Sequence, residues 1–157
     1  MYERILVPLD GSPTAAVALE HAEALAEKLG SHLVLLRVVH TLEDLAPAST
    51  PSLAQAAMSQ DVVSRTTSAG EHAAARAYLA ELTDALARRG VAAEALVREG
   101  APAGQIVTTA STAGAGLIVM TAYGAGGAHT RTQRAVFGGT ADEVLRQSHI
   151  PVLLIRP

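Results

Sequence analysis

Residues 4–39 read RILVPLDGSPTAAVALEHAEALAEKLGSHLVLLRVV, and this stretch decides the fold. It opens and closes on short apolar runs, residues 4–9 and 32–39, whose length and β-branched content are typical of buried strands. Between the two runs, Ser12 followed by Pro13 is a helix-start signal and Gly30 is a helix-stop signal. Two buried strands that flank a helix predict a βαβ unit with parallel pairing and a right-handed crossover.

The rest of the chain continues this alternation of helix and strand. We expect a long helix over residues 64–89, an outer strand over 91–98 and a short helix from Pro102. A central strand over 117–120 then leads into a glycine-rich turn over 121–127. A last helix after Gly138 and a closing strand over 151–155 complete the chain. Residues 40–60 show no clear period and are expected to form a long surface connection.

These elements predict an α/β fold in one domain, residues 1–157. The expected architecture is a single open doubly wound five-stranded parallel sheet, Rossmann-like, with helices on both faces. In such a sheet the ligand site lies beyond the carboxyl ends of the strands, which directs attention to Asp10, Val38 and Met120.

Composition excludes several classes of protein. Hydrophobic residues make up 49% of the chain, which rules out a disordered tail protein, and aromatic residues only 3%, so the core must be Ala, Val, Leu and Ile. The formal net charge of −3 offers no general attraction to nucleic acid or to an anionic membrane. The chain has no cysteine, and its six histidines show no metal-binding spacing. The opening apolar run meets Asp10 too soon for a signal peptide, and no run approaches the roughly 18 apolar residues of a membrane span. We therefore expect a cytoplasmic domain with no resident metal and no nucleic-acid or membrane partner.

The order and spacing of these segments resembles the universal stress protein (UspA-like) family. The opening ILVPLDGSPTAAVALEHAEALAEKLG, followed by LVLLRVV, is similar to that family's first βαβ unit, and GAPAGQIV, LIVM and FGGTADEVLRQSHIPVLLI are similar to its second half. The resemblance covers the whole chain except residues 40–60, where the family varies. It implies a nucleotide-binding α/β domain, commonly a homodimer, in a family with one branch that binds ATP and another that does not.

The resemblance also implies where phosphates would bind. In the ATP-binding branch the pattern is a glycine, two residues, a second glycine, nine residues, and then a glycine with a serine or threonine. The corresponding positions here are Thr121, Gly124, Gly138 and Gly139. This chain departs from the pattern because Thr121 replaces a glycine, Gly139 replaces the hydroxyl residue, and the thirteen residues between Gly124 and Gly138 are four more than usual. Thr140 could return a hydroxyl only if the turn changes register.

Each departure has a physical consequence. Backbone N–H groups near Gly138 and Gly139 would still attract phosphate, but a lost hydroxyl weakens binding by about ten- to a hundredfold. A threonine at position 121 would be strained if that position requires a positive φ. The longer loop carries Arg131 and Arg134, which are either phosphate ligands or solvated side chains.

At the adenosine end, the resemblance implies that Asp10 lines the adenine and ribose. Asp10 could equally cap the first helix or close a turn, and both roles are compatible. Pro8, Leu9, Val38 and Met120 match family positions that wall the adenine, although each alone is also consistent with ordinary strand core. The binding residues implied by the resemblance are Pro8, Leu9, Asp10, Val38, Met120, Thr121, Gly124, Gly138, Gly139 and Thr140.

The closing strand carries a separate indication. Val152–Ile155 is apolar on both faces of the expected strand, and we expect it at or near the edge of the sheet. Such an edge favours pairing with another chain unless it is covered. Because the family's dimers are similar, we expect a homodimer that pairs through this strand.

Three functions remain open at this point. The first is a nucleotide-responsive stress protein that binds ATP, with Mg²⁺ on the phosphates, and changes its contacts with an unknown protein partner. The second is a dimeric interaction module of the same fold whose loop over residues 121–137 has lost the site. The third is a slow phosphohydrolase, for which the sequence offers no placed general base, arginine finger or metal carboxylate cluster. We therefore assign no catalytic residue and do not expect an enzyme.

Overall fold

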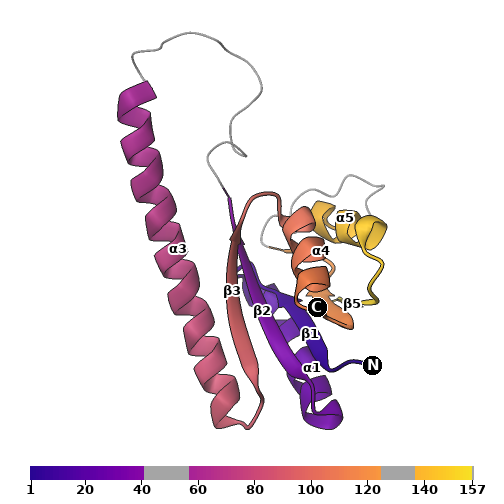
Figure 1. Cartoon of the computed structure of the whole chain (residues 1–157). Coiled ribbons are helices and arrows are strands. Elements are labelled where there is room, and N and C mark those ends of the chain that lie inside the picture. The colour runs from indigo at the N-terminus through magenta and orange to yellow at the C-terminus, as the bar shows by residue number, and fades with distance from the viewer. Residues whose placement is uncertain (41–56, 125–136, 157) are drawn as a thin grey trace.

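The computed structural model describes residues 1–40, 57–124 and 137–156, with residues 57–68 described through their backbone alone. The elements in chain order are β1 (Arg4–Pro8), α1 (Pro13–Leu29), β2 (His32–Val39), α3 (Ala57–Arg88), β3 (Ala93–Glu99), α4 (Pro102–Thr112), β4 (Leu117–Thr121), α5 (Gly139–Gln147) and β5 (Val152–Ile155). The strands form one five-stranded parallel sheet in the order β3-β2-β1-β4-β5 (Figure 1). The predicted α/β class and open doubly wound sheet are confirmed.

The first βαβ unit forms as its sequence predicts. β1 pairs in parallel with β2 along its whole length. Ser12 caps α1, since its Oγ accepts a hydrogen bond from the N–H of Ala15 at 3.1 Å, and Pro13 occupies the first turn. Gly30 ends the helix in the left-handed conformation at φ 67°, and its N–H donates to the carbonyl of Ala26.

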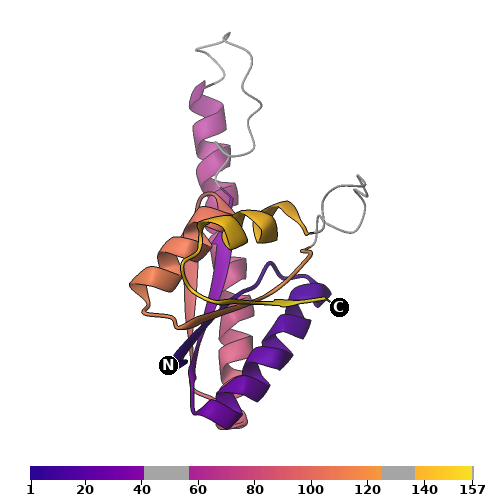
Figure 2. The ribbon, with the colours of Figure 1, turned by 90° about the vertical axis from the view of Figure 1, so that its right-hand side faces the viewer.

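Two apolar cores lie on opposite faces of the sheet. Helices α1 and α3 cover one face and α4 and α5 the other, as two views at right angles show (Figures 1 and 2). In β2, Leu33 and Leu35 join the first core, whereas Val34 and Leu36 join the second. The residues that α1 buries are four alanines and one leucine, and such small side chains allow a helix to approach a sheet closely.

Both edges of the sheet agree with the sequence. β3 lies at one edge, as expected for the outer strand, and β5 lies at the other, as expected for the closing strand. Within the described ranges, every helix is too short or too polar to serve as a membrane span.

Some predicted boundaries were wrong. The connection predicted over residues 40–60 is shorter, because α3 begins at Ala57 rather than near residue 64; residues 41–56 lie outside the described part of the chain. Residues 57–63 show no clear apolar period, so the sequence pattern did not indicate that the helix begins there. Thr121 is the last residue of β4 rather than the first residue of a turn, because it pairs with Ile155 of β5.

Candidate functional site

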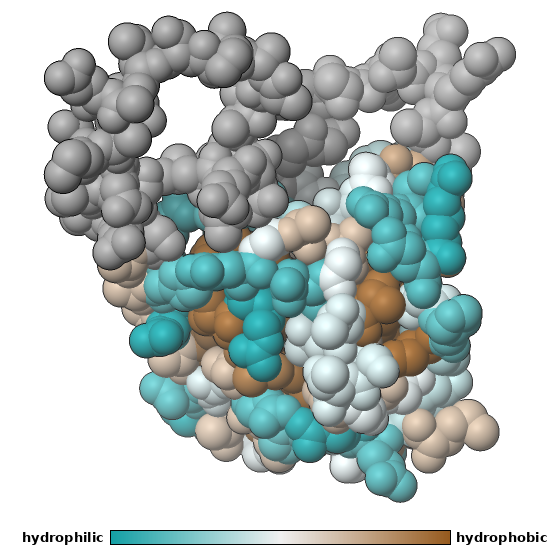
Figure 3. Space-filling view, turned by 45° about the horizontal axis from the view of Figure 1, so that its top comes forward, coloured by the Kyte–Doolittle hydropathy of each residue, from teal (hydrophilic) through white to brown (hydrophobic). Residues whose placement is uncertain are grey.

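A cavity of about 590 Å³ lies beyond the carboxyl ends of the strands. From the central strand β1, the chain runs first toward β2 and β3 and later toward β4 and β5, which makes β1 and β4 the switch point of the sheet. All of the residues implied by the resemblance line this cavity: Pro8, Leu9, Asp10, Val38, Met120, Thr121, Gly124, Gly138, Gly139 and Thr140. The view that brings this edge forward shows apolar surface in hollows between polar side chains (Figure 3).

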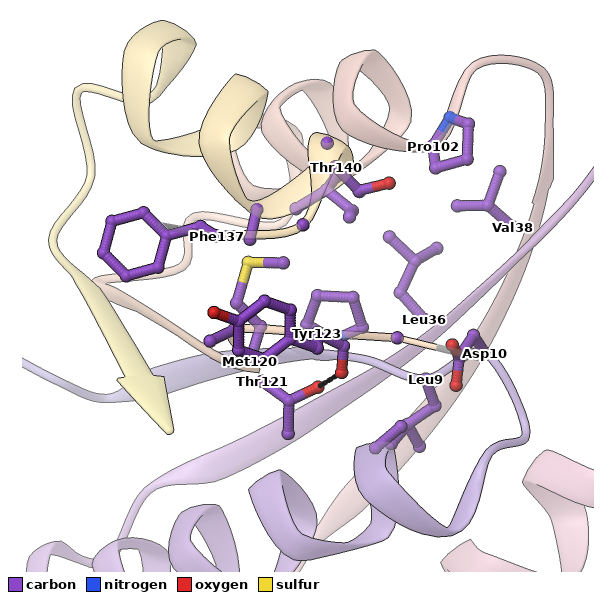
Figure 4. A pocket seen from close by; sticks show the side chains of 18 of the residues that line it. Leu9, Asp10, Leu36, Val38, Pro102, Met120, Thr121, Tyr123, Phe137 and Thr140 are labelled. Carbon is purple, nitrogen blue, oxygen red and sulfur yellow. Dashed lines mark hydrogen bonds between the residues drawn. The ribbon is translucent and has the colours of Figure 1, made fainter. Parts of the chain in front are cut away.

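One wall of the cavity is apolar. In Figure 4, Leu36, Val38 and Pro102 gather at one end of the cavity and Phe137 lies at the other. Leu9 and Met120 line the cavity and also belong to the two buried cores. Leu9 and Met120 are therefore both part of the strand core and part of the cavity wall.

Asp10 is fixed at the edge of the cavity by the start of α1. Its Oδ1 accepts hydrogen bonds from both the backbone N–H of Ser12, at 2.9 Å, and the Ser12 hydroxyl. Its Oδ2 lies against Gly124, where a Cβ would come within 2.6 Å of that oxygen. The turn-closing role of Asp10 is confirmed, and the second oxygen explains why residue 124 is a glycine.

The turn into α5 also depends on close backbone approach. The N–H of Gly138 donates to the carbonyl of Ala122 at 2.8 Å, and a Cβ at Gly138 would lie 3.2 Å from that same oxygen. The N–H of Gly138 is therefore engaged within the chain and cannot be the main donor to a phosphate. The first helical hydrogen bond of α5 runs from Asp142 to the carbonyl of Gly138 at 2.9 Å.

Further backbone donors at the cavity belong to the first turn of α5. Gly139, Thr140 and Ala141 line the cavity and precede the first donor of the helical hydrogen-bond ladder. Such N–H groups, together with the helix dipole, attract anions. The arrangement can bind an anionic group at the α5 end and hydroxyl or amine donors at Asp10.

Two of the departures from the phosphate pattern cause no strain. Thr121 belongs to an extended strand, and its hydroxyl donates to the carbonyl of Tyr123 at 3.0 Å, so no positive φ is needed there. Around Gly139, no atom would lie within 4 Å of an added Cβ. The hydroxyl residue of the family pattern would therefore fit at position 139. The loop residues Gly126, Gly127, His129, Arg131 and Arg134 lie outside the described part of the chain.

Sequence reasoning missed several residues of the cavity, notably Arg37, His40 and Tyr123. A signal for Arg37 was present, because it is the one charged residue within the apolar run LVLLRVV. His40 and Tyr123 follow the carboxyl ends of β2 and β4, so their only signal was this position in the predicted parallel sheet. Phe137 lines the cavity as well, and the Arg156 guanidinium lies 5.3 Å from its ring centre.

Arg37 and Asp10 both affect the pKa of Tyr78. Burial raises the pKa of Tyr78 above its ordinary value; the Arg37 guanidinium lowers it in part, and the Asp10 carboxylate raises it further. The Tyr78 hydroxyl therefore stays protonated at neutral pH and remains a hydrogen-bond donor. Among the residues that the structure describes, no three His, Asp or Glu side chains gather closely enough to hold a metal ion.

Comparisons with known proteins agree on one family. The model of the universal stress protein family matches residues 1–156. Among solved structures, the universal stress protein UspA from Lactobacillus plantarum has a TM-score of 0.80 at 25% identity, covering 99% of this chain and 98% of that one. A universal stress protein family member from Burkholderia pseudomallei has a TM-score of 0.70 at 29% identity, covering 98% and 96%.

One further structure is a universal stress protein in complex with cAMP, with a TM-score of 0.65 at 21% identity, covering 99% of this chain and 97% of that one. At this identity the likeness concerns the fold alone. No curated protein matches the sequence. The family model spans nearly the whole chain, and this chain therefore belongs to the universal stress protein family.

Proposed function

We propose that this universal stress protein binds an adenine nucleotide, ATP with Mg²⁺ on its phosphates, and acts as a cytoplasmic homodimer. The observation that carries the proposal is the set of backbone donors at Gly139, Thr140 and Ala141, which open α5 against a cavity of about 590 Å³. A cavity of this size is within the usual range for small-molecule sites. The cAMP complex of a structural neighbour supports a nucleotide as the class of ligand.

The chemistry of the cavity suits the parts of a nucleotide. The adenine would lie against the apolar side chains of Pro8, Val38 and Met120, and the ribose hydroxyls would donate to Asp10. The phosphates would accept hydrogen bonds from the first turn of α5. The described residues offer no metal cluster of their own, so phosphate oxygens would be the ligands of Mg²⁺.

We test this with isothermal titration of Mg-ATP into the wild type and Thr140→Glu. Thr140 is exposed in the first turn of α5. A carboxylate there is stabilised by the helix dipole, so the helix should persist, but the carboxylate repels a phosphate. The matched control is Thr14→Glu, in the first turn of α1, because Thr14 does not line the cavity. We expect at least tenfold weaker binding in Thr140→Glu and near-wild-type binding in Thr14→Glu.

The main alternative is a dimeric interaction module that binds no nucleotide. Two observations favour it: the N–H of Gly138 is already engaged by Ala122, and Gly139 lacks the hydroxyl of the family pattern. The same titration separates the two functions, because absence of heat with wild-type protein and Mg-ATP would favour the interaction module. In either case we propose binding rather than turnover as the role of the protein, with hydrolysis at most weak.

We also propose that two copies pair through β5. This strand lies at the sheet edge, and Leu153 is 37% exposed there, while Leu145 on α5 is 38% exposed. A lysine on an edge strand discourages strand pairing. Sedimentation velocity should therefore show a dimer for the wild type and a monomer for Leu153→Lys. The control Leu29→Lys, at a 55% exposed leucine at the end of α1, should remain dimeric; a monomeric wild type would contradict the proposal.

A further inference from the structure

A second cavity, of about 340 Å³, adjoins the first on the α3 side of the sheet. The two cavities share Arg37, Val38 and His40, at the carboxyl end of β2. The side cavity is completed by Gly11 and by residues of α3, among them Ala74 and Tyr78. A group that leaves the main cavity past Asp10 and Gly11 therefore enters a space bordered by Arg37.

Arg37 is held at this boundary by the backbone that follows β1. Its Nη1 donates a long hydrogen bond, 3.4 Å, to the carbonyl of Leu9, which uses one of the five N–H donors of the guanidinium. The guanidinium lies over Gly11, where a Cβ would come within 3.1 Å of Nη1. Arg37 therefore lies beside the residue that follows Asp10, with donors left for another acceptor.

The rest of the side cavity suits a phosphate group. Tyr78 keeps its proton at neutral pH and can donate a hydrogen bond, and Ala74 and Ala75 are too small to fill the space. An arginine fork matches phosphate geometry with two parallel hydrogen bonds. Glu71, which is exposed and also lines the side cavity, opposes an anion, so the attraction must come chiefly from Arg37.

We infer that the side cavity binds a second phosphate, carried on the 2′ or 3′ position of the ribose of an adenine nucleotide, and that Arg37 is the residue that recognises it. This inference depends on the proposed nucleotide site. The ribose would lie at Asp10, and a phosphate on one hydroxyl leaves the other to donate to that carboxylate. Arg37 then distinguishes a ribose-phosphorylated nucleotide from a simple 5′-nucleotide.

The test measures the affinities of AMP, adenosine 2′,5′-bisphosphate and adenosine 3′,5′-bisphosphate by isothermal titration, with Mg-ATP as a reference ligand. In the wild type we expect at least one bisphosphate to bind about ten- to a hundredfold more tightly than AMP. In Arg37→Gln this ratio should fall to near one. The matched control is Arg98→Gln: Arg98 is exposed on β3, donates to the carbonyl of Val97 and lines neither cavity, so the ratio should persist.

A second variant acts from the opposite wall. Ala74→Glu adds a carboxylate to the side cavity from an exposed position of α3, where glutamate is a good helix former. It should remove the preference for the bisphosphate while AMP binds as in the wild type. The control Ala73→Glu adds the same charge at the neighbouring exposed position, which lines neither cavity.

The outcomes separate the two proposals. If Mg-ATP and AMP bind but neither bisphosphate binds more tightly than AMP, the side cavity does not recognise phosphate and this inference alone fails. The same conclusion follows if the ratio is unchanged in Arg37→Gln or in Ala74→Glu. If no nucleotide binds to the folded wild type, both the nucleotide site and this inference are wrong.

Discussion

The first βαβ unit and the corner where β4 leads to α5 both depend on glycine, but for different reasons. Gly30 ends α1 in the left-handed conformation, and no atom would lie within 4 Å of an added Cβ, so its requirement is local. Gly124 and Gly138 are glycines because other groups approach them: the Asp10 carboxylate in one case and the Ala122 carbonyl in the other. The first region is specified by neighbours in sequence, and the second by contacts that only the folded chain creates.

The difference predicts that core changes in the first unit act on stability. Leu35 lies in the middle of β2 and is 0% exposed, so Leu35→Ala should lower the free energy of unfolding by about 2–5 kcal/mol. Urea denaturation followed by circular dichroism measures this loss. Leu29→Ala, at a 55% exposed leucine at the end of α1, is the control and should cost far less. Equal losses in the two variants would contradict the assignment of the core.

A methyl group at the corner where β4 leads to α5 should weaken nucleotide binding rather than lower stability. In Gly124→Ala the added Cβ would lie 2.6 Å from Asp10 Oδ2, so the carboxylate must move from its place beside the cavity. Loss of a hydrogen bond to a charged group corresponds to about a ten- to hundredfold weaker affinity for Mg-ATP, measured by isothermal titration. Unchanged affinity would show that Asp10 does not contact the nucleotide.

At the same corner, a substitution should strengthen nucleotide binding. Gly139→Ser restores the hydroxyl of the family pattern at a position where an added Cβ meets nothing within 4 Å. We expect Mg-ATP to bind about tenfold more tightly, because a hydroxyl donor is added beside the phosphates. Gly139→Ala is the control, since it adds the Cβ without the hydroxyl. A gain in both variants would attribute the effect to helix rigidity rather than to hydrogen bonding.

The smallest expected effect returns to the first region. In Gly30→Ala the added Cβ meets no other atom within 4 Å, but the residue must keep a left-handed backbone conformation that alanine disfavours. We therefore expect the free energy of unfolding to fall by about 1–2 kcal/mol. Thermal and urea denaturation measure the loss, and titration should show unchanged nucleotide affinity. An affinity change as large as that of Gly124→Ala would remove the distinction between the two regions.

Local sequence signals were sufficient for most of the fold. The apolar runs, the Ser12–Pro13 helix start and the glycine stop of α1 are short-range features, and the structure forms them as predicted. The start of α3 was missed because residues 57–63, AMSQDVV, show no clear apolar period. Which residues meet at the cavity followed from the rule that ligands bind at the carboxyl edge of such sheets, combined with the family resemblance.

What sequence could not predict depends on contacts across the fold. The donation from Gly138 to the carbonyl of Ala122 joins two ends of a loop, and no local pattern indicates it. The position of Arg37 over Gly11 likewise follows from the register of β1 against β2. Both features change the account of the site, the first by moving the phosphate donors into α5 and the second by placing a cation between two cavities.

The most direct test of the nucleotide site is a titration of ¹⁵N-labelled protein with Mg-ATP, followed by the backbone amide signals. The account predicts that the largest downfield proton shifts occur at Gly139, Thr140 and Ala141, and that Gly138, whose N–H already donates to Ala122, shifts much less. Signals at these three residues that stay unmoved at saturating Mg-ATP would contradict it.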